Sequence, residues 1–269
     1  MATGCRRCLN GLVHASKATS AAAPRLDDDQ VRELLALARG ADSIELKLTV
    51  AEEHRYSTLE ALGIDPLDAY IRQVFFFDTD DLALDRAGVV ARARRSQGRP
   101  DDSVVKLRPV EPDTLDASDR KSDDFVVEVD AMPGGYVCSA SFKGKLSKPH
   151  VKGAVAGEVP IRKLFSKSQR AFFEAHAPEG IGLDDLQVLG PVTVFKLKTA
   201  PGDLRQKLAV ELWNYPDGTR ILELSTKCAP GDAFQVAAES RAFLTALGID
   251  LGDEQQTKTR TALEYFAGG

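Results

Sequence analysis

Apolar and polar residues alternate over many short stretches of the chain, the pattern of β-strands with one buried face. Residues 43–50 show it clearly, with Ile44, Leu46 and Leu48 on one face and charged residues on the other. Gly and Pro turn signals separate the stretches, among them a hairpin signature at 216–218. We expect about eight strands, drawn from residues 43–50, 73–78, 89–95, 103–110, 125–131, 135–146, 192–199, 204–213 and 220–227.

Apolar residues three and four apart predict helices near both ends of the chain and between two β blocks. Acidic residues 27–29 can cap the first helix, which should end near Gly40. Residues 147–187 are expected to be a helical insert. This order predicts an α+β protein, with a closed antiparallel β-barrel, or a sandwich, decorated by helices. The other predicted helices span residues 57–72, 161–176, 232–247 and 254–266.

The composition is that of a globular protein and limits the partners. The 269 residues are 43% hydrophobic and 28% charged, and no apolar run approaches the roughly 18 residues of a membrane span. The formal net charge of −5 argues against a protein that coats nucleic acid, which usually carries a basic excess. We therefore expect neither nucleic acid nor a membrane as partner.

The four cysteines do not form a convincing disulfide framework. Cys5 and Cys8 have the spacing of a metal or redox pair, but no second Cys or His pair lies nearby to complete a zinc site. A reducing, cytoplasmic compartment is the simpler interpretation. Residues 1–26 are expected to be a disordered tail, although the first 24 also resemble an organellar transit peptide in composition.

Charged residues recur at every second position of the predicted strands and so share one face. A sheet with one solvated face would also alternate in this way. Three features favour a charged barrel interior instead. On these faces the cations outnumber the acids by ten to five in an acidic chain, they form same-face pairs that repel without an anion between them, and helices are available to cover the outside. The cations, which we expect to bind phosphate, are Lys47, Arg92, Arg94, Lys106, Arg108, Lys143, Lys145, Lys196, Lys198 and Lys207.

Polyphosphate is the ligand that fits this residue set. Arg offers planar, bidentate donors to phosphate oxygens, and Lys offers a compact charge. Carboxylates from separate strands could hold Mg²⁺ or Mn²⁺, which take oxygen ligands and bridge to substrate phosphates. A pore of about eight strands has room for a small ligand but not for a macromolecule.

An ordered series of motifs along the chain resembles the CYTH family, also called triphosphate tunnel metalloenzymes. Residues 43–47 (Ser-Ile-Glu-Leu-Lys) stand where the family has Glu-x-Glu-x-Lys. The resemblance runs from residue 41 to about residue 266. Its other motifs are the Phe-rich Phe-Asp-Thr segment at 74–80, Gly-x-x-x-Arg-x-Arg at 88–94, Lys-x-Arg at 106–108, Glu-x-Asp at 128–130, Lys-x-Lys at 196–198, and the late acids at 211 and 223.

The resemblance implies a tunnel that binds a triphosphate and a divalent ion, as in class IV adenylate cyclases, thiamine triphosphatases and inorganic triphosphatases. It implies Mg²⁺ or Mn²⁺ as cofactor and tripolyphosphate, thiamine triphosphate or ATP as ligand. By the same likeness, Glu45 and Lys47 would be catalytic. The implied metal ligands are Glu45, Glu128, Glu211 and Glu223.

Two positions depart from the family pattern: Ser43 and Ser225 stand where family members have glutamates that help to bind metal. Losing two carboxylates weakens a site that depends on ligand charge. Hydrolysis of a triphosphate is the favoured function, since no motif for reading a purine is visible. Cyclisation of a nucleotide, and a degenerate tunnel that binds polyphosphate without turnover, remain open alternatives. A third, structural alternative is an empty barrel that serves as an interaction platform.

Overall fold

The computed structural model describes residues 27–147, 149–202, 204–249 and 258–267. The predicted tail, residues 1–26, and the pair Cys5 and Cys8 lie outside this range. Within it, the strands are β1 (Ser43–Val50), β2 (Tyr70–Asp78), β3 (Val89–Ser96), β4 (Asp101–Leu107), β5 (Phe125–Met132), β6 (Gly135–Leu146), β7 (Gln187–Thr199), β8 (Leu208–Asn214) and β9 (Arg220–Cys228). The helices are α1 (Asp28–Gly40), α2 (Arg55–Ala61), α3 (Ala83–Arg86), α4 (His150–Val155), α5 (Lys167–His176), α6 (Ala233–Ala246) and α7 (Lys258–Ala267).

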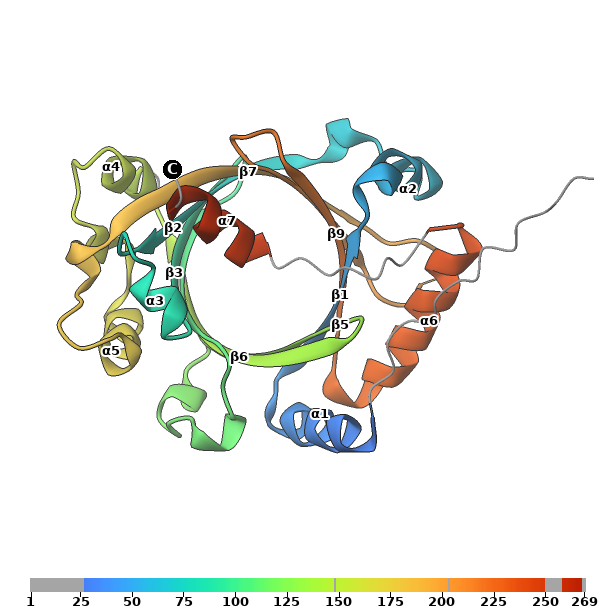
Figure 1. Cartoon of the computed structure of the whole chain (residues 1–269), viewed down its shortest axis with the longest axis horizontal. Coiled ribbons are helices and arrows are strands. Elements are labelled where there is room, and N and C mark those ends of the chain that lie inside the picture. Colours follow the sequence, from blue (N-terminus) through green and yellow to red (C-terminus); the bar gives the residue numbers. More distant parts are fainter. Residues whose placement is uncertain (1–26, 148, 203, 250–257, 268–269) are drawn as a thin grey trace, which may run out of the picture.

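The strands close into one barrel, seen end-on in Figure 1. Going around it, the order is β1-β5-β6-β4-β3-β2-β7-β8-β9, and β9 pairs with β1 to complete the ring. The predicted closed barrel in an α+β protein is thus confirmed. The barrel has nine strands rather than about eight, because every predicted β segment enters it.

The barrel is mixed, not antiparallel throughout, because β1 and β5 run parallel. The odd number of strands requires this. Strand directions can alternate around a closed ring only when the number of strands is even, so nine strands leave at least one parallel pair. Here the parallel pair sets Ser43 opposite Glu128 and Glu45 opposite Asp130.

The predicted helix 57–72 is wrong in its second half. Helix α2 ends at Ala61, and Gly63 follows with φ +62°, the left-handed conformation that favours glycine at a helix end. A short 3-10 turn at Pro66–Asp68 then leads directly into β2. Its first turn is capped by the Asp65 side chain, which accepts from the Leu67 backbone N–H at 2.8 Å. Residues 70–72, expected as helix, are therefore strand.

Apolar residues cover the outer surface of the barrel and pack under the helices. One cluster joins α1, α4 and α5 to the outer faces of the strands, with Ile44, Val105 and Val127 among its members. Another joins Leu244 of α6 to Leu48 and Leu222. In Figure 1 these helices surround the ring, and α7 lies across its opening. In the described part of the chain, no helix is long and apolar enough to cross a membrane.

The buried side chain of Gln169 ties helix α5 to the barrel by hydrogen bonds. The Gln169 amide donates from Nε2 to the carbonyl oxygens of Ser103 and Phe142 at 3.1 and 3.2 Å. Its Oε1 accepts from the Ser103 hydroxyl at 3.1 Å. The Phe172 ring of the same helix stacks edge-on against Phe125 and Phe142.

We expect Gln169→Ala to lower the free energy of unfolding by about 2 kcal/mol, because buried carbonyl groups would lose their donor. Urea denaturation followed by tryptophan fluorescence measures this. The matched control is Glu174→Ala, an exposed residue of the same helix, which should stay within about 0.5 kcal/mol of the wild type. Equal stabilities for the two variants would contradict this account of how α5 is held.

Candidate functional site

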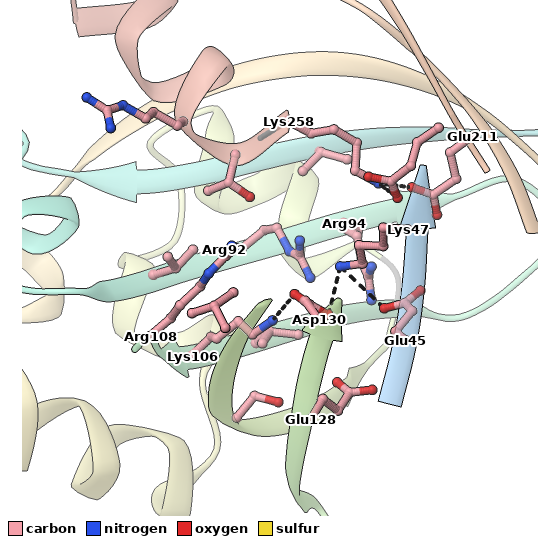
Figure 2. A pocket seen from close by; sticks show the side chains of 18 of the residues that line it. Glu45, Lys47, Arg92, Arg94, Lys106, Arg108, Glu128, Asp130, Glu211 and Lys258 are labelled. Carbon is pink, nitrogen blue, oxygen red and sulfur yellow. Dashed lines mark hydrogen bonds and ion pairs between the residues drawn. The ribbon is translucent and has the colours of Figure 1, made fainter. Parts of the chain in front are cut away.

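A charged cavity of about 540 Å³ lies inside the barrel. Its volume is that of a pocket for a small molecule. Of the described residues, eleven basic and six acidic side chains line it. Figure 2 shows several of them pointing toward one another from separate strands. The interior therefore carries a positive excess although the chain as a whole is acidic.

Most of the acids and most of the cations lie on opposite parts of the cavity wall. Five of the six acids occupy four adjacent strands, β8, β9, β1 and β5, which we call the acidic wall; they are Glu211, Glu223, Glu45, Glu128 and Asp130. The sixth, Asp85, belongs to α3. The other five strands, β6, β4, β3, β2 and β7, form the basic wall; its cations are Lys143, Lys106, Arg108 (directly after β4), Arg92, Arg94, Arg72 and Lys196.

Ammonium groups neutralise the acidic wall. The Lys47 Nζ lies 2.9 Å from Asp130 Oδ1 and 3.4 Å from Glu45 Oε2. The Lys106 Nζ approaches the other oxygen of Asp130 at 3.7 Å. The Lys47 pairs lie at the parallel β1–β5 junction, whereas Lys106 reaches Asp130 from β4, on the far side of β6. Figure 2 shows these groups close together in the cavity.

Glu128 and Glu211 each bind two ammonium groups. Glu128 contacts Lys143 at 3.1 Å and also Lys227 of β9. Glu211 contacts Lys196 and, at 2.7 Å, Lys258 of α7. The cations at the edges of the basic wall are therefore used to balance the neighbouring acids.

Two cations at the centre of the basic wall, Arg92 and Arg108, have no such balance. Arg94 pairs with Asp102, with 2.8 Å between Nε and Oδ1. Arg92 and Arg108 form no ion pair with any described residue, and the Arg92 Nε is buried without a hydrogen-bond partner. An anion in the cavity would supply the partner that these guanidinium groups lack.

Burial and charge shift the pKa values of the lining groups. Burial, helped by repulsion from Lys47, lowers the pKa of Lys106 to about 8. Burial and the neighbouring Arg94 lower the pKa of Arg92. For Asp130 burial alone would raise the pKa, but attraction to Lys106 and Lys47 outweighs it and brings the pKa to about 2. The pKa of Lys47 rises because Asp130 and Glu45 outweigh its burial.

Most of the sequence-predicted phosphate ligands meet in this cavity, but three do not. Lys145, Lys198 and Lys207 are exposed and lie outside its lining. Lys145 and Lys198 stand near the ends of their strands, beyond the part that encloses the cavity, and Lys207 precedes β8. The predicted residues that line the cavity are Glu45, Lys47, Arg92, Arg94, Lys106, Arg108, Glu128, Lys143, Lys196, Glu211 and Glu223.

Several lining residues were not predicted. Arg72 was assigned to a helix, although its period-two spacing with Val74 could have indicated a strand. Lys227 shares the face of Glu223 on β9, so strand parity could have found it. Lys258 and Arg260 belong to α7, which is outside the barrel strands, and no sequence pattern connects them to the site.

The carboxylates do not form a ready-made metal site. Within the described ranges there is no group of three or more His, Cys, Asp or Glu side chains that could hold an ion. Each carboxylate of the acidic wall contacts at least one ammonium group. Ser43 and Ser225 are buried and supply no charge, and the Ser43 hydroxyl has no hydrogen-bond partner. A divalent ion would have to displace lysines to reach these acids.

Solved structures share this fold, and two of them are similar to this chain over most of its length. A candidate adenylate cyclase from Bacillus halodurans matches with a TM-score of 0.56 and 16% identity over 82% of this chain and 97% of that one. A candidate adenylyl cyclase from Hippeastrum, described as having a dominant triphosphatase activity, matches with a TM-score of 0.61 and 15% identity over 82% of this chain and 94% of that one. No family model and no curated protein matches the sequence. The two structural matches and the closed barrel confirm the tunnel fold that the motifs implied.

We expect Arg92→Met to raise the free energy of unfolding of the ligand-free protein by about 1 kcal/mol, because it removes an unpaired cation beside Arg94 and keeps most of the packing volume. Urea denaturation in a buffer free of phosphate and other polyanions measures this. Arg95→Met, on the same strand but outside the cavity lining, is the control and should gain nothing. A loss of stability in Arg92→Met would show that the guanidinium is already well satisfied.

The stability of the protein should fall between about pH 4 and pH 2. The folded-state pKa of Asp130 is about 2, below its usual value of 3.8, so the stabilisation from its charged form is complete above pH 4 and is lost as the pH falls through 2. Glu128 contributes in the same direction, with a pKa of about 2. Asp130 alone accounts for about 2 kcal/mol.

Urea denaturation at several pH values tests this acid dependence. Asp130→Asn should be less stable than the wild type at pH 7 and should lose less stability between pH 4 and pH 2. Glu53→Gln, an exposed acid, is the control and should keep the wild-type slope. An unchanged slope in Asp130→Asn would show that Asp130 is not held by its lysines.

Proposed function

We propose that this protein binds a triphosphate-containing small molecule in the barrel cavity and hydrolyses it, as a member of the triphosphate tunnel family. The observation that carries the proposal is the basic wall, where Arg92 and Arg108 have no acidic partner. Buried like charges without a counterion are unfavourable, and a polyphosphate supplies several negative oxygens to guanidinium and ammonium donors. Tripolyphosphate, thiamine triphosphate and ATP all have this group.

In the proposed reaction, water attacks the terminal phosphorus, the bond to the bridging oxygen breaks, and the remaining phosphates leave. Cations fixed in advance stabilise the charge that develops on the leaving oxygens. The water must also lose a proton. Glu45 suits that role, because it contacts one lysine, and its side chain is 29% exposed while Asp130 is 2% exposed. Lys47, held between Glu45 and Asp130, would position it.

Mg²⁺ or Mn²⁺ belongs to the proposal as well, on the strength of the resemblance. When bound, such an ion would neutralise phosphate charge and could arrive already attached to the triphosphate.

The two described cysteines, Cys138 and Cys228, are free and buried, which agrees with the proposed cytoplasmic setting.

A specific observation favours a second candidate, a tunnel that binds polyphosphate without turnover. The carboxylates of the acidic wall are already paired with lysines. Ser43 and Ser225, both buried, stand where the family motif has glutamates. Such a protein would keep the basic wall and lose the means to organise a metal. Binding and turnover must therefore be measured separately.

We expect tripolyphosphate to bind the wild type at low salt and to raise its melting temperature, because it binds only the folded state. Arg92→Met should weaken binding at least about tenfold, through the loss of a charge-assisted hydrogen-bond donor. The control Arg95→Met should bind like the wild type. Calorimetric titration without metal measures all three. Absence of binding to the wild type at low salt would rule out the proposed function.

Turnover is then assayed by phosphate release and by cyclic nucleotide formation. Tripolyphosphate, thiamine triphosphate and ATP are each tested with Mg²⁺, with Mn²⁺ and with a chelator. Phosphate release that needs the metal is the expected result. Cyclic nucleotide as the main product would indicate a cyclase, and binding without turnover would indicate the binding module.

A further inference from the structure

One lysine from outside the barrel joins two acids of the acidic wall. The Lys258 Nζ lies 2.7 Å from Glu211 Oε2 and also forms an ion pair with Glu223 Oε1. Glu211 and Glu223 face each other across the β8–β9 pairing, so their carboxylates lie on one face of adjacent strands. Figure 2 shows Lys258 entering from the helix with its ammonium group beside Glu211.

Other contacts fix Lys258 in this place. Its ammonium lies 4.9 Å from the centre of the Trp213 ring, whose Nε1 donates to the same Glu211 oxygen at 3.0 Å. The Lys258 carbonyl accepts from the Tyr215 hydroxyl at 3.0 Å. Further along α7, Leu263 is buried in the apolar cluster around Trp213. The start of the helix is thus held so that this one side chain reaches the acid pair.

The acid pair needs a cation. Both carboxylates are almost completely buried, and two negative charges on facing residues repel strongly in such surroundings. Lys196 on β7 contacts Glu211, but Lys258 is the one described side chain that forms an ion pair with Glu223. Two facing carboxylates are also the ligands that a divalent ion takes when it binds substrate phosphates. An ammonium and a metal ion cannot both occupy the space between the same oxygen atoms.

We infer that Lys258 is a built-in competitor for divalent cations at Glu211 and Glu223, so that an ion binds there only when α7 withdraws this side chain. Metal binding and docking of the start of α7 are then coupled and oppose each other. The inference rests on the proposed function only in its choice of ligand class. It is tested with metal alone, so its failure is distinct from a failure of triphosphate binding.

The first test titrates Mn²⁺ into the full chain without triphosphate, and electron paramagnetic resonance measures the free ion. Lys258→Met removes the ammonium but keeps an apolar side chain against Trp213, and it should bind Mn²⁺ at least about tenfold more tightly than the wild type. The control Arg95→Met removes the same charge from β3 outside the cavity lining, so its affinity should stay near that of the wild type. Adding Glu223→Gln to Lys258→Met should abolish the gain.

The second test uses the unchanged protein, in case Lys258→Met folds poorly with two unpaired acids. Saturating Mn²⁺ should speed hydrogen exchange of the backbone amides in residues 258–267, because the ion displaces the side chain that ties the helix to the cavity. Exchange in α5 should not change. The inference is overturned by equal Mn²⁺ affinity in Lys258→Met and wild type, by a gain that survives Glu223→Gln, or by α7 exchange that is unaffected at saturating Mn²⁺.

Discussion

Repulsion between like charges in a poorly solvated interior is the constraint on which the rest of this structure depends. In a barrel lumen of about 540 Å³ lined by eleven basic and six acidic side chains, stability depends on how many of the charges have a partner of opposite sign. The strand order meets much of this need by gathering five of the six acids on four adjacent strands and seven of the eleven cations on or directly after the other five. Where the two walls meet, Lys143 reaches Glu128 and Lys196 reaches Glu211.

Balancing the edges leaves the middle of the basic wall with cations that no acid neutralises. Arg92 and Arg108 are in that position, and it is there that the proposed anionic ligand would gain most. The groups that would favour binding of the proposed ligand therefore work against the stability of the empty barrel, the usual opposition between a functional site and a stable core. On the acidic wall the position is reversed, since lysines satisfy the carboxylates in the free protein and would compete with any metal.

Closure of the barrel decides which charges meet. With nine strands, one neighbouring pair must be parallel, and the pair is β1 with β5, far apart in sequence. This junction sets Glu45 beside Asp130 and lets Lys47 bridge them. A second long-range contact comes from α7, which is not part of the barrel. Its first residue, Lys258, neutralises Glu211 of β8 and Glu223 of β9.

The sequence by itself determined most of the strands and their charged faces, because side-chain parity along a strand is a local property; the closed barrel was implied by the family resemblance rather than by any local pattern. Glu45 with Lys47, and Arg92 with Arg94, could be placed on shared faces from spacing alone. Only the tertiary structure decided which faces oppose each other, that β1 runs parallel to β5, and that Arg72, Lys227 and Lys258 join the cavity while Lys198 does not. The physical reason is that electrostatic pairing depends on distances between side chains from distant strands. Those distances are set by strand order and barrel closure, which no local pattern records.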